Sequence, residues 1–355
     1  MLLRRFFSLA LLSLFACGCS ESATSSNGGG TQAGGAAEAS SVPEPPFEML
    51  DLETFARLPD AKPPMMRSVT MLMYDAPGKA VESYGVLKDK LVAAHWRELP
   101  GGNLSAEYDS ANGFFRRGDH VLTLSITKGR EPDSVSVTMQ HHGNLDLAKL
   151  PLPKDAESVY RFPHTAGYTT AASAEETQKT FGEAMTAAGW SVLENSPGST
   201  TYKRGVQTVQ VSISAAPAQG GKTMMQISPQ LLPVDLPVPP KAEDVRFNHR
   251  PVQLTFQYPG EGDEVAKFFQ TELPRSGWKP TTDNLIKNEN DAFQIYRNAE
   301  KAFAELKVET RGGKTHATLE YQSPTVFEEN EKRFEEFRKK QEAEKATKTE
   351  GAAKP

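Results

Sequence analysis

The sequence predicts an α+β fold of three tandem modules, each with one helix packed on a small antiparallel sheet. Tryptophans recur at Trp96, Trp190 and Trp278, at spacings of 94 and 88 residues. Each follows a stretch in which apolar residues recur at three and four, which is the period of an amphipathic helix. Each precedes alternating apolar and polar runs separated by polar, glycine-bearing turns, which are typical of hairpins.

Composition limits the classes of protein to consider. The 355 residues leave room for two or three domains, and 38 % hydrophobic residues are enough to form cores. The net charge of −5 is close to neutral for this length, whereas a nucleic-acid-binding protein favours a basic face. We therefore expect no nucleic acid among its partners.

The first residues have the layout of a secretory signal. Arg4 and Arg5 precede an apolar run over residues 6–16, and small residues with two cysteines follow it. A membrane-spanning helix needs roughly 20 apolar residues, so this shorter run favours a signal over a permanent transmembrane helix.

The end of the run resembles the lipobox of bacterial lipoproteins, in which Leu and two small residues precede the acylated cysteine. Leu14–Cys17 fits apart from the bulky Phe15, and Ala16–Cys19 fits apart from an Ala in place of Leu. The resemblance implies attachment of lipid, such as palmitate, at Cys17, with Cys19 as the second choice. The alternative is an ordinary signal peptide that is cleaved to release a soluble protein.

The two cysteines also bear on the compartment. Cys17 and Cys19 are the only cysteines of the chain, so no disulfide is expected in the part that follows. No Asp follows either one, which by the same resemblance implies the outer membrane, on its periplasmic or cell-surface side. The membrane is then a partner through the lipid anchor alone.

The expected organisation follows from these patterns. Residues 20–46 are mostly Ser, Gly, Ala, Thr and Pro, which bury too little to offset their ordering entropy, so they predict a disordered tether. The expected segments are signal peptide and anchor at 1–19, linker at 20–46, modules at 47–150, 151–236 and 237–324, and a charged helix with a disordered tail at 325–355.

Each module is expected to contain one strand, one helix and then three strands. The first strand of the first module is expected at Val69–Tyr74. Gly189 is a plausible stop for the second helix, and Pro274 is expected to end the third helix early. A helix ending in Gly-Trp before several strands resembles the repeated small modules of some bacterial lipoproteins, a resemblance that implies no activity.

The three tryptophans can be interpreted in two ways, as core residues or as binding residues. A large aromatic side chain directly after the helix can close the end of a core between helix and sheet, and this reading is favoured for Trp96, Trp190 and Trp278. The alternative is an aromatic surface for binding.

The sequence carries no familiar catalytic signature. Nucleophile elbows, phosphate loops and dinucleotide fingerprints are missing, and the histidines lack metal-ligand spacing. His141 and His142 are adjacent at the end of an expected strand and are interpreted as solvated loop histidines. We therefore expect no enzyme activity, no cofactor and no metal.

The C-terminal segment is dominated by Glu, Lys and Arg from Glu328 to Lys345, with favourable pairs four residues apart. Phe327, Phe334 and Phe337 form a sparse apolar stripe along it. The pattern predicts an exposed helix that is either docked by this stripe or extended from the body.

The sequence-based hypothesis is a non-enzymatic, lipid-anchored protein of the cell envelope. Its three modules would present surfaces to a partner protein or to an envelope polymer. The alternative is a small-ligand carrier or an enzyme with its site between modules.

Overall fold

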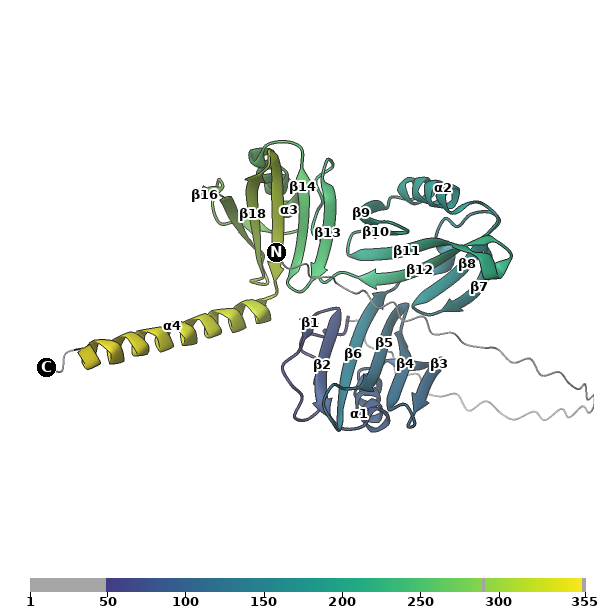
Figure 1. The fold of residues 1–355 in the computed structure, drawn as a ribbon, viewed down its shortest axis with the longest axis horizontal. Helices are drawn as coiled ribbons and strands as arrows, with labels where there is room; N and C mark the ends of the chain where they lie inside the picture. Colours follow the sequence, from purple (N-terminus) through teal and green to yellow (C-terminus); the bar gives the residue numbers. More distant parts are fainter. Residues whose placement is uncertain (1–48, 289–290, 353–355) are drawn as a thin grey trace, which may run out of the picture. The chain divides into compact units, whose positions relative to one another are not determined.

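The structure is a computed structural model that describes residues 49–288 and 291–352. The expectations for the signal, for Cys17 and Cys19 and for the tether lie outside these residues. The described chain forms three antiparallel sheets, each accompanied by one helix of 14 residues, and ends in the long helix α4 (Figure 1).

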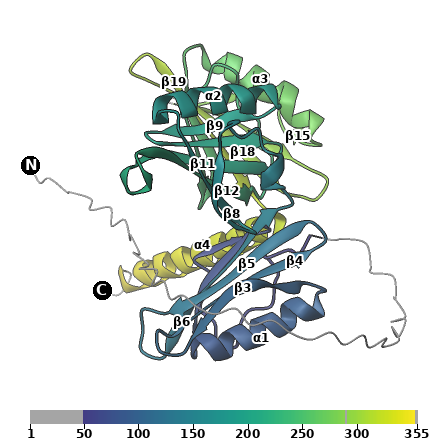
Figure 2. The same ribbon diagram turned by 90° about the vertical axis from the view of Figure 1, so that its right-hand side faces the viewer.

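The first sheet has six strands in the order β1-β2-β6-β5-β4-β3. Helix α1 (Ala80–Ala93) lies along one face, where it buries Tyr84, Leu87 and Leu91 against the strands (Figure 2). The strands are β1 (Met66–Ser68), β2 (Met71–Pro77), β3 (Arg97–Ser105), β4 (Ser110–Arg117), β5 (His120–Lys128) and β6 (Ser134–Gly143).

The second sheet repeats this order, β7-β8-β12-β11-β10-β9. Helix α2 (Ala174–Ala187) begins at Ser173, whose side chain accepts the Glu176 N–H as a helix N-cap. It buries Phe181 and Met185 in the core. The strands are β7 (Glu157–Phe162), β8 (Thr165–Thr170), β9 (Ser191–Ser196), β10 (Ser199–Arg204), β11 (Gln207–Ala216) and β12 (Lys222–Leu231).

The third sheet has seven strands, in the order β13-β14-β19-β18-β17-β15, with β16 also paired to β17. Helix α3 (Gly262–Arg275) buries Val265, Phe269 and Leu273 against it. The strands are β13 (Glu243–His249), β14 (Val252–Tyr258), β15 (Lys279–Pro280), β16 (Ile286–Lys287), β17 (Asp291–Arg297), β18 (Phe303–Arg311) and β19 (Lys314–Gln322).

The expected α+β class is wrong, because the described chain is dominated by strands. A hairpin precedes each helix where one strand was expected: β1 and β2 stand in place of the single strand at Val69–Tyr74. An additional strand also directly follows the first two helices, as β3 and β9. The extra strands lie at sheet edges, and β3, β7 and β9 are largely exposed, so these three lack the apolar alternation that marks a half-buried strand.

The third helix also differs from its expectation. It was expected to end before Pro274, but it runs to Arg275 with Pro274 in its last turn. The Pro274 carbonyl accepts the Gly277 N–H at 3.0 Å, so the turn keeps a hydrogen bond at its end.

Helix α4 (Pro324–Ala352) begins directly after β19. Its first turn docks through Phe327, which stacks on Phe303 of β18 with 5.4 Å between ring centroids. Phe334 and Phe337 are 67 % and 58 % exposed, so only the beginning of the expected stripe docks. No helix among the described residues is long and apolar enough to cross a membrane.

Candidate functional site

All three tryptophans are buried, with at most 3 % of their surface exposed. Trp96 lies 5.4 Å from the His141 ring, and Trp278 meets Tyr321 edge to face at 6.1 Å. The Arg204 guanidinium lies over Trp190, 4.5 Å from the ring centroid. Indole faces at this depth are out of reach of a ligand unless the surrounding side chains move.

The backbone explains why a tryptophan follows each helix. The Trp96, Trp190 and Trp278 N–H groups each donate to the carbonyl five residues earlier, at 2.9, 3.0 and 3.2 Å. The residue before each tryptophan is left-handed: φ is 63° at His95, 81° at Gly189 and 83° at Gly277. These features make three Schellman caps, in which the residue after the left-handed position packs back on the last turn. Gly189 therefore lies just beyond the second helix, where a stop was expected.

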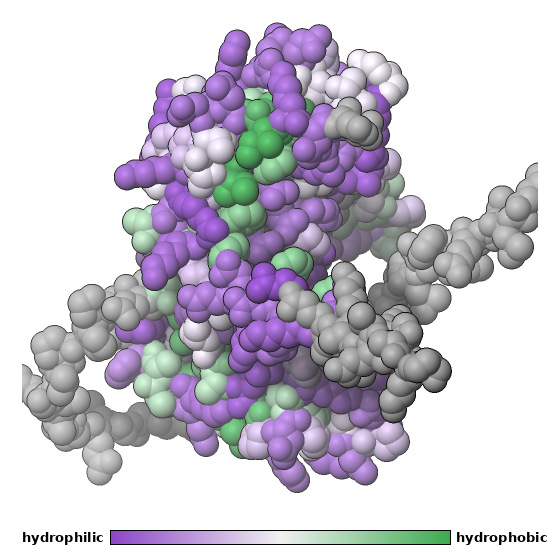
Figure 3. Space-filling view, turned by 90° about the vertical axis from the view of Figure 1, so that its left-hand side faces the viewer, coloured by the Kyte–Doolittle hydropathy of each residue, from purple (hydrophilic) through white to green (hydrophobic). Residues whose placement is uncertain are grey.

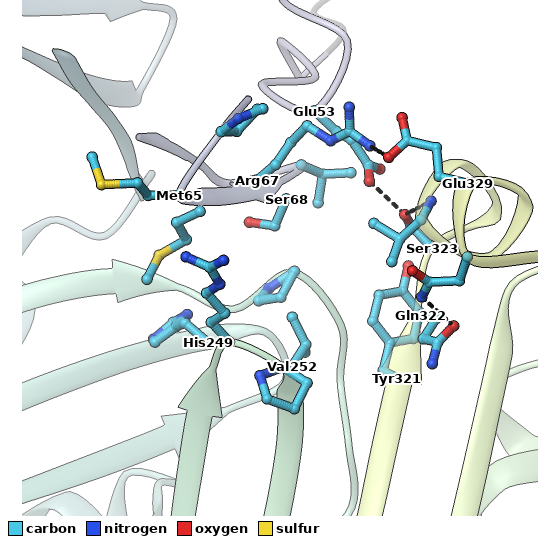
Figure 4. A pocket seen from close by; sticks show the side chains of 18 of the residues that line it. Glu53, Met65, Arg67, Ser68, His249, Val252, Tyr321, Gln322, Ser323 and Glu329 are labelled. Atoms are coloured by element: carbon cyan, nitrogen blue, oxygen red, sulfur yellow. Dashed lines mark hydrogen bonds and ion pairs between the residues drawn. The ribbon is translucent and has the colours of Figure 1, made fainter. Parts of the chain in front are cut away.

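The candidate functional site is a pocket of about 610 Å³, here called the junction pocket (Figure 4). Five segments that are distant in sequence form its wall. They are the segment around Glu53, the run 63–69 that includes β1, Pro233, the turn 249–252 between β13 and β14, and residues 320–333 of β19 and α4.

The wall combines an apolar part with both signs of charge. Its apolar side chains are Pro63, Pro64, Met65, Met66, Val69, Pro233, Pro251, Val252 and Val326. Its charged side chains are Glu53, Arg67, Arg250, Glu320, Glu329 and Arg333. Pockets of this volume and mixture are typical of sites that enclose a small molecule or a short chain segment.

Two polar contacts fasten the start of α4 to the first sheet's side of the pocket. The Ser323 hydroxyl donates to Glu53 Oε1 at 2.5 Å and accepts the Val326 N–H at 3.2 Å. Arg67 on β1 pairs with Glu329 on α4 at 2.7 Å. Figure 4 shows Glu53, Arg67, Ser323 and Glu329 converging at one side of the pocket.

The acidic side chains of the pocket all have partners, but two of its cations do not. Glu53 and Glu329 are engaged as described, and Glu320 accepts a hydrogen bond from the Gln322 amide at 2.9 Å. Arg250 and Arg333 form no ion pair with any other described residue. The pocket can therefore accept an anionic group without breaking an existing ion pair.

Burial shifts several ionisable groups of the pocket. It raises the pKa of Glu53, although the hydrogen bond from Ser323 acts in the opposite direction. It raises the pKa of Tyr321 to about 12 and lowers the pKa of His249. At neutral pH the pocket therefore presents a neutral phenol and a neutral imidazole beside its carboxylates and guanidiniums.

The hydroxyl of Ser323 is an aliphatic hydroxyl group at this end of the pocket that both donates and accepts a hydrogen bond. Ser323 is the N-cap of α4, and both its hydrogen-bonding functions are taken by Glu53 and Val326. Its hydroxyl is thus a structural group rather than an activated nucleophile. Among residues 49–288 and 291–352, no group of three or more His, Cys, Asp or Glu side chains is placed to hold a metal ion.

A second cleft, of about 990 Å³, lies between the edge strands β9 and β13. An unpaired edge can bind an extended chain, but both strands carry register shifts in their pairing, and Asp244 on β13 is left-handed with φ 49°. Irregularities of this kind hinder an edge strand from pairing with a further strand. The junction pocket is the stronger candidate site.

The interpretation of His141 and His142 as solvated loop residues is wrong. They are 0 % and 7 % exposed and belong to β6. His141 Nε2 donates to the Leu50 carbonyl at 2.7 Å, and His142 contacts the second sheet. Both histidines are buried by segments that are far away in sequence, so the residues around them could not predict their burial.

The junction pocket was also not anticipated residue by residue. Trp96 and Trp190 do not line it, and Trp278 touches it only through Tyr321. The run Pro63–Met66 is the one part of its wall that is continuous in sequence and apolar, and that pattern is equally typical of a loop.

No family model matches the chain, and no curated protein or solved structure matches it either.

Proposed function

We propose that this chain is a non-enzymatic, lipid-anchored binding protein of the cell envelope, acylated at Cys17 or Cys19. We propose further that the junction pocket holds its ligand, a short segment of a partner protein or of an envelope polymer. The observation that carries the proposal is the convergence of an apolar wall, two guanidiniums that pair with no described residue, and engaged carboxylates around about 610 Å³.

The architecture of the pocket supports a binding role. Its walls come from the first sheet, the third sheet and α4, so an occupant contacts elements that no single sheet supplies. Its carboxylates are satisfied internally, which leaves Arg250 and Arg333 to meet an anionic group of a ligand. A carrier of a free small molecule would use the same walls and is the alternative.

The test compares two Met→Trp variants of the full chain, each expressed in its envelope. Met65→Trp adds bulk inside the junction pocket, and Met49→Trp adds the same bulk at an exposed position outside it. The proteins are extracted in mild detergent, and the bound molecules are identified by mass spectrometry. We expect a molecule that wild type and Met49→Trp retain and that Met65→Trp loses at least tenfold. Equal recovery from all three proteins would contradict the assignment of the pocket.

The anchor has a separate test. Replacement of both Cys17 and Cys19 is expected to abolish labelling by a fatty-acid analogue, and the single replacements identify the acylated residue. Unchanged labelling of the double variant would refute acylation at these positions, whatever the result for the pocket.

A second candidate is recognition of a partner protein by α4. The specific observation is the exposure of Phe334 and Phe337 on an otherwise polar helix. The face in Figure 3 is mostly hydrophilic, with hydrophobic areas scattered among the hydrophilic residues. Serine at both positions is expected to weaken binding to such a partner and to leave recovery of the pocket ligand unchanged.

A further inference from the structure

A group of aromatic rings joins the first sheet to the second. Phe114 and His142 come from the first sheet, and Phe162 and His164 come from the β7–β8 hairpin of the second; these four residues are called the histidine contact. The His164 ring stacks on Phe114 at 4.7 Å and lies 5.3 Å from the His142 ring. Strands β6 and β12 approach each other at the same place.

Hydrogen bonds fix the tautomer that His142 adopts while its ring is neutral. Its Nδ1 lies 3.0 Å from the Pro229 carbonyl on β12, and a carbonyl only accepts, so Nδ1 carries the proton. Its Nε2 lies 2.7 Å from the Thr123 hydroxyl, which can donate to the neutral ring and accept from the protonated one. The bond to Pro229 remains possible in the protonated ring and acts against the lowering of its pKa by burial. This neutral tautomer satisfies both nitrogens, and its Nδ1–H bond bridges the two sheets.

His164 is held without such a bond. Its Nδ1 is buried and has no hydrogen-bond partner among the described residues. Burial lowers the pKa of His164, and it lowers the pKa of His142 to about 4. A proton on either ring adds a cation to an apolar contact, and the two rings repel each other when both are protonated.

The ionisable neighbours do not relieve this cost. His141 and His164 both disfavour a proton on His142, and His120 disfavours one on His141. The carboxylates that act nearby are Asp51 on His141 and Asp119 on His120, not on the contact itself. The charged residues of β4 and β7 are Arg116, Arg117, Arg161 and Glu157, and β12 carries Lys222, which pairs with Glu157.

We propose that the contact between the first and second sheets is an acid-released latch, closed while His142 and His164 are neutral and opened when they take up protons. Opening exposes both rings to water, where they accept protons more readily, so acid drives the equilibrium towards the open state. From the pKa values of about 4 closed and 6.5 free, His142 alone raises the open-to-closed ratio on the order of 100-fold by pH 4.5. The ratio stops increasing below about pH 4, where both states hold the proton.

The test measures the distance between the sheets in the full chain. Cys17 and Cys19 are replaced by Ser, and spin labels are placed at Arg130→Cys, in an exposed loop, and Ala218→Cys, in an exposed 3-10 turn. Pulsed electron resonance at pH 7.5 and 4.5 gives the distance distribution, and far-UV circular dichroism reports whether the strands persist. We expect one narrow distance at pH 7.5 and a second, longer population at pH 4.5 with the dichroism retained.

Matched variants assign the response to the histidine contact. His142→Asn with His164→Phe keeps an amide donor and an aromatic stack but removes both titrations, so the pH-dependent population should disappear. His316→Gln, on β19 of the third sheet, should respond like wild type. If the double variant does not close at pH 7.5, His164→Phe alone should still weaken the acid response severalfold.

Three results would overturn the latch. They are an acid response that persists in the double variant, one that is unchanged in His164→Phe, and a wild-type distance that changes only when the dichroism is lost. The last would mean that acid unfolds the sheets rather than separating them.

Discussion

The left-handed residue before each tryptophan leads to a specific prediction for His95→Gly. Two of the three Schellman caps have glycine at this position, and the first has His95 with φ 63°. A left-handed conformation costs a non-glycine residue roughly 1–2 kcal/mol. Glycine loses about 0.5–1 kcal/mol more on folding because its unfolded chain is freer. We therefore expect His95→Gly to stabilise the folded chain by about 0.5–1 kcal/mol.

The matched control is at the second helix, where a glycine in the same left-handed position is replaced by a residue with a Cβ. A Cβ added to Gly189 meets no heavy atom within 4 Å, so Gly189→Ala perturbs only the backbone and should destabilise by a similar amount. Urea unfolding of both variants, followed by tryptophan fluorescence and circular dichroism, measures the two changes. Destabilisation by His95→Gly would refute the reasoning, because it would show that the His95 side chain contributes more than its backbone strain costs.

Three further predictions concern stability. Burial lowers the pKa of His141 to about 4 from 6.5, so the unfolded chain takes up a proton first as pH falls, and about 2.5 kcal/mol of stability should be lost between pH 7.5 and 4.5. Urea unfolding of His141→Asn should lack this part of the pH-dependent loss. A pKa of His141 near 6.5, titrated by NMR in the folded chain, would contradict the prediction. Ser323→Ala removes the N-cap of α4, at a cost of about 1 kcal/mol, and also the donor to the buried Glu53 carboxylate, at a further cost of about 1–3 kcal/mol, with Ser323→Thr close to wild type in thermal unfolding. A Cβ on Gly113 would lie 1.8 Å from the Tyr84 hydroxyl oxygen, so Gly113→Ala should destabilise by about 2 kcal/mol, whereas Gly85→Ala, in α1 with open space around it, should stabilise by about 0.5–1 kcal/mol. Similar values for these two alanines would refute the packing argument.

The helices were predictable because their apolar period of three to four residues reflects direct contact with a sheet. The edge strands were not. The β7 strand has no buried residue, and β3 contains Pro100, Gly101 and Gly102, so neither alternates as a half-buried strand does. Their strand conformation is imposed by pairing with a neighbour, which a local pattern does not encode.

The binding site was harder to predict for a related reason. The junction pocket requires Glu53 and Ser323 to meet, and these residues are 270 positions apart. The burial of His142 likewise depends on Pro229 of another sheet. Such encounters follow from the packing of whole sheets against each other, and no spacing within one segment records them.

The hydrogen bond between Ser323 and Glu53 has a consequence for deletion experiments. It closes most of the described chain into a ring, with the first segment fastened to the start of the last helix. A truncation that removes α4 together with Ser323 takes the donor from a buried carboxylate beside the first sheet, at the opposite end of the sequence. A truncation that removes either Glu53 or Ser323 therefore perturbs both regions, and the resulting loss of stability or binding belongs to both. A chain break within a loop of the second sheet keeps the hydrogen bond between Ser323 and Glu53, so it is better suited to separating the contributions of the sheets to stability.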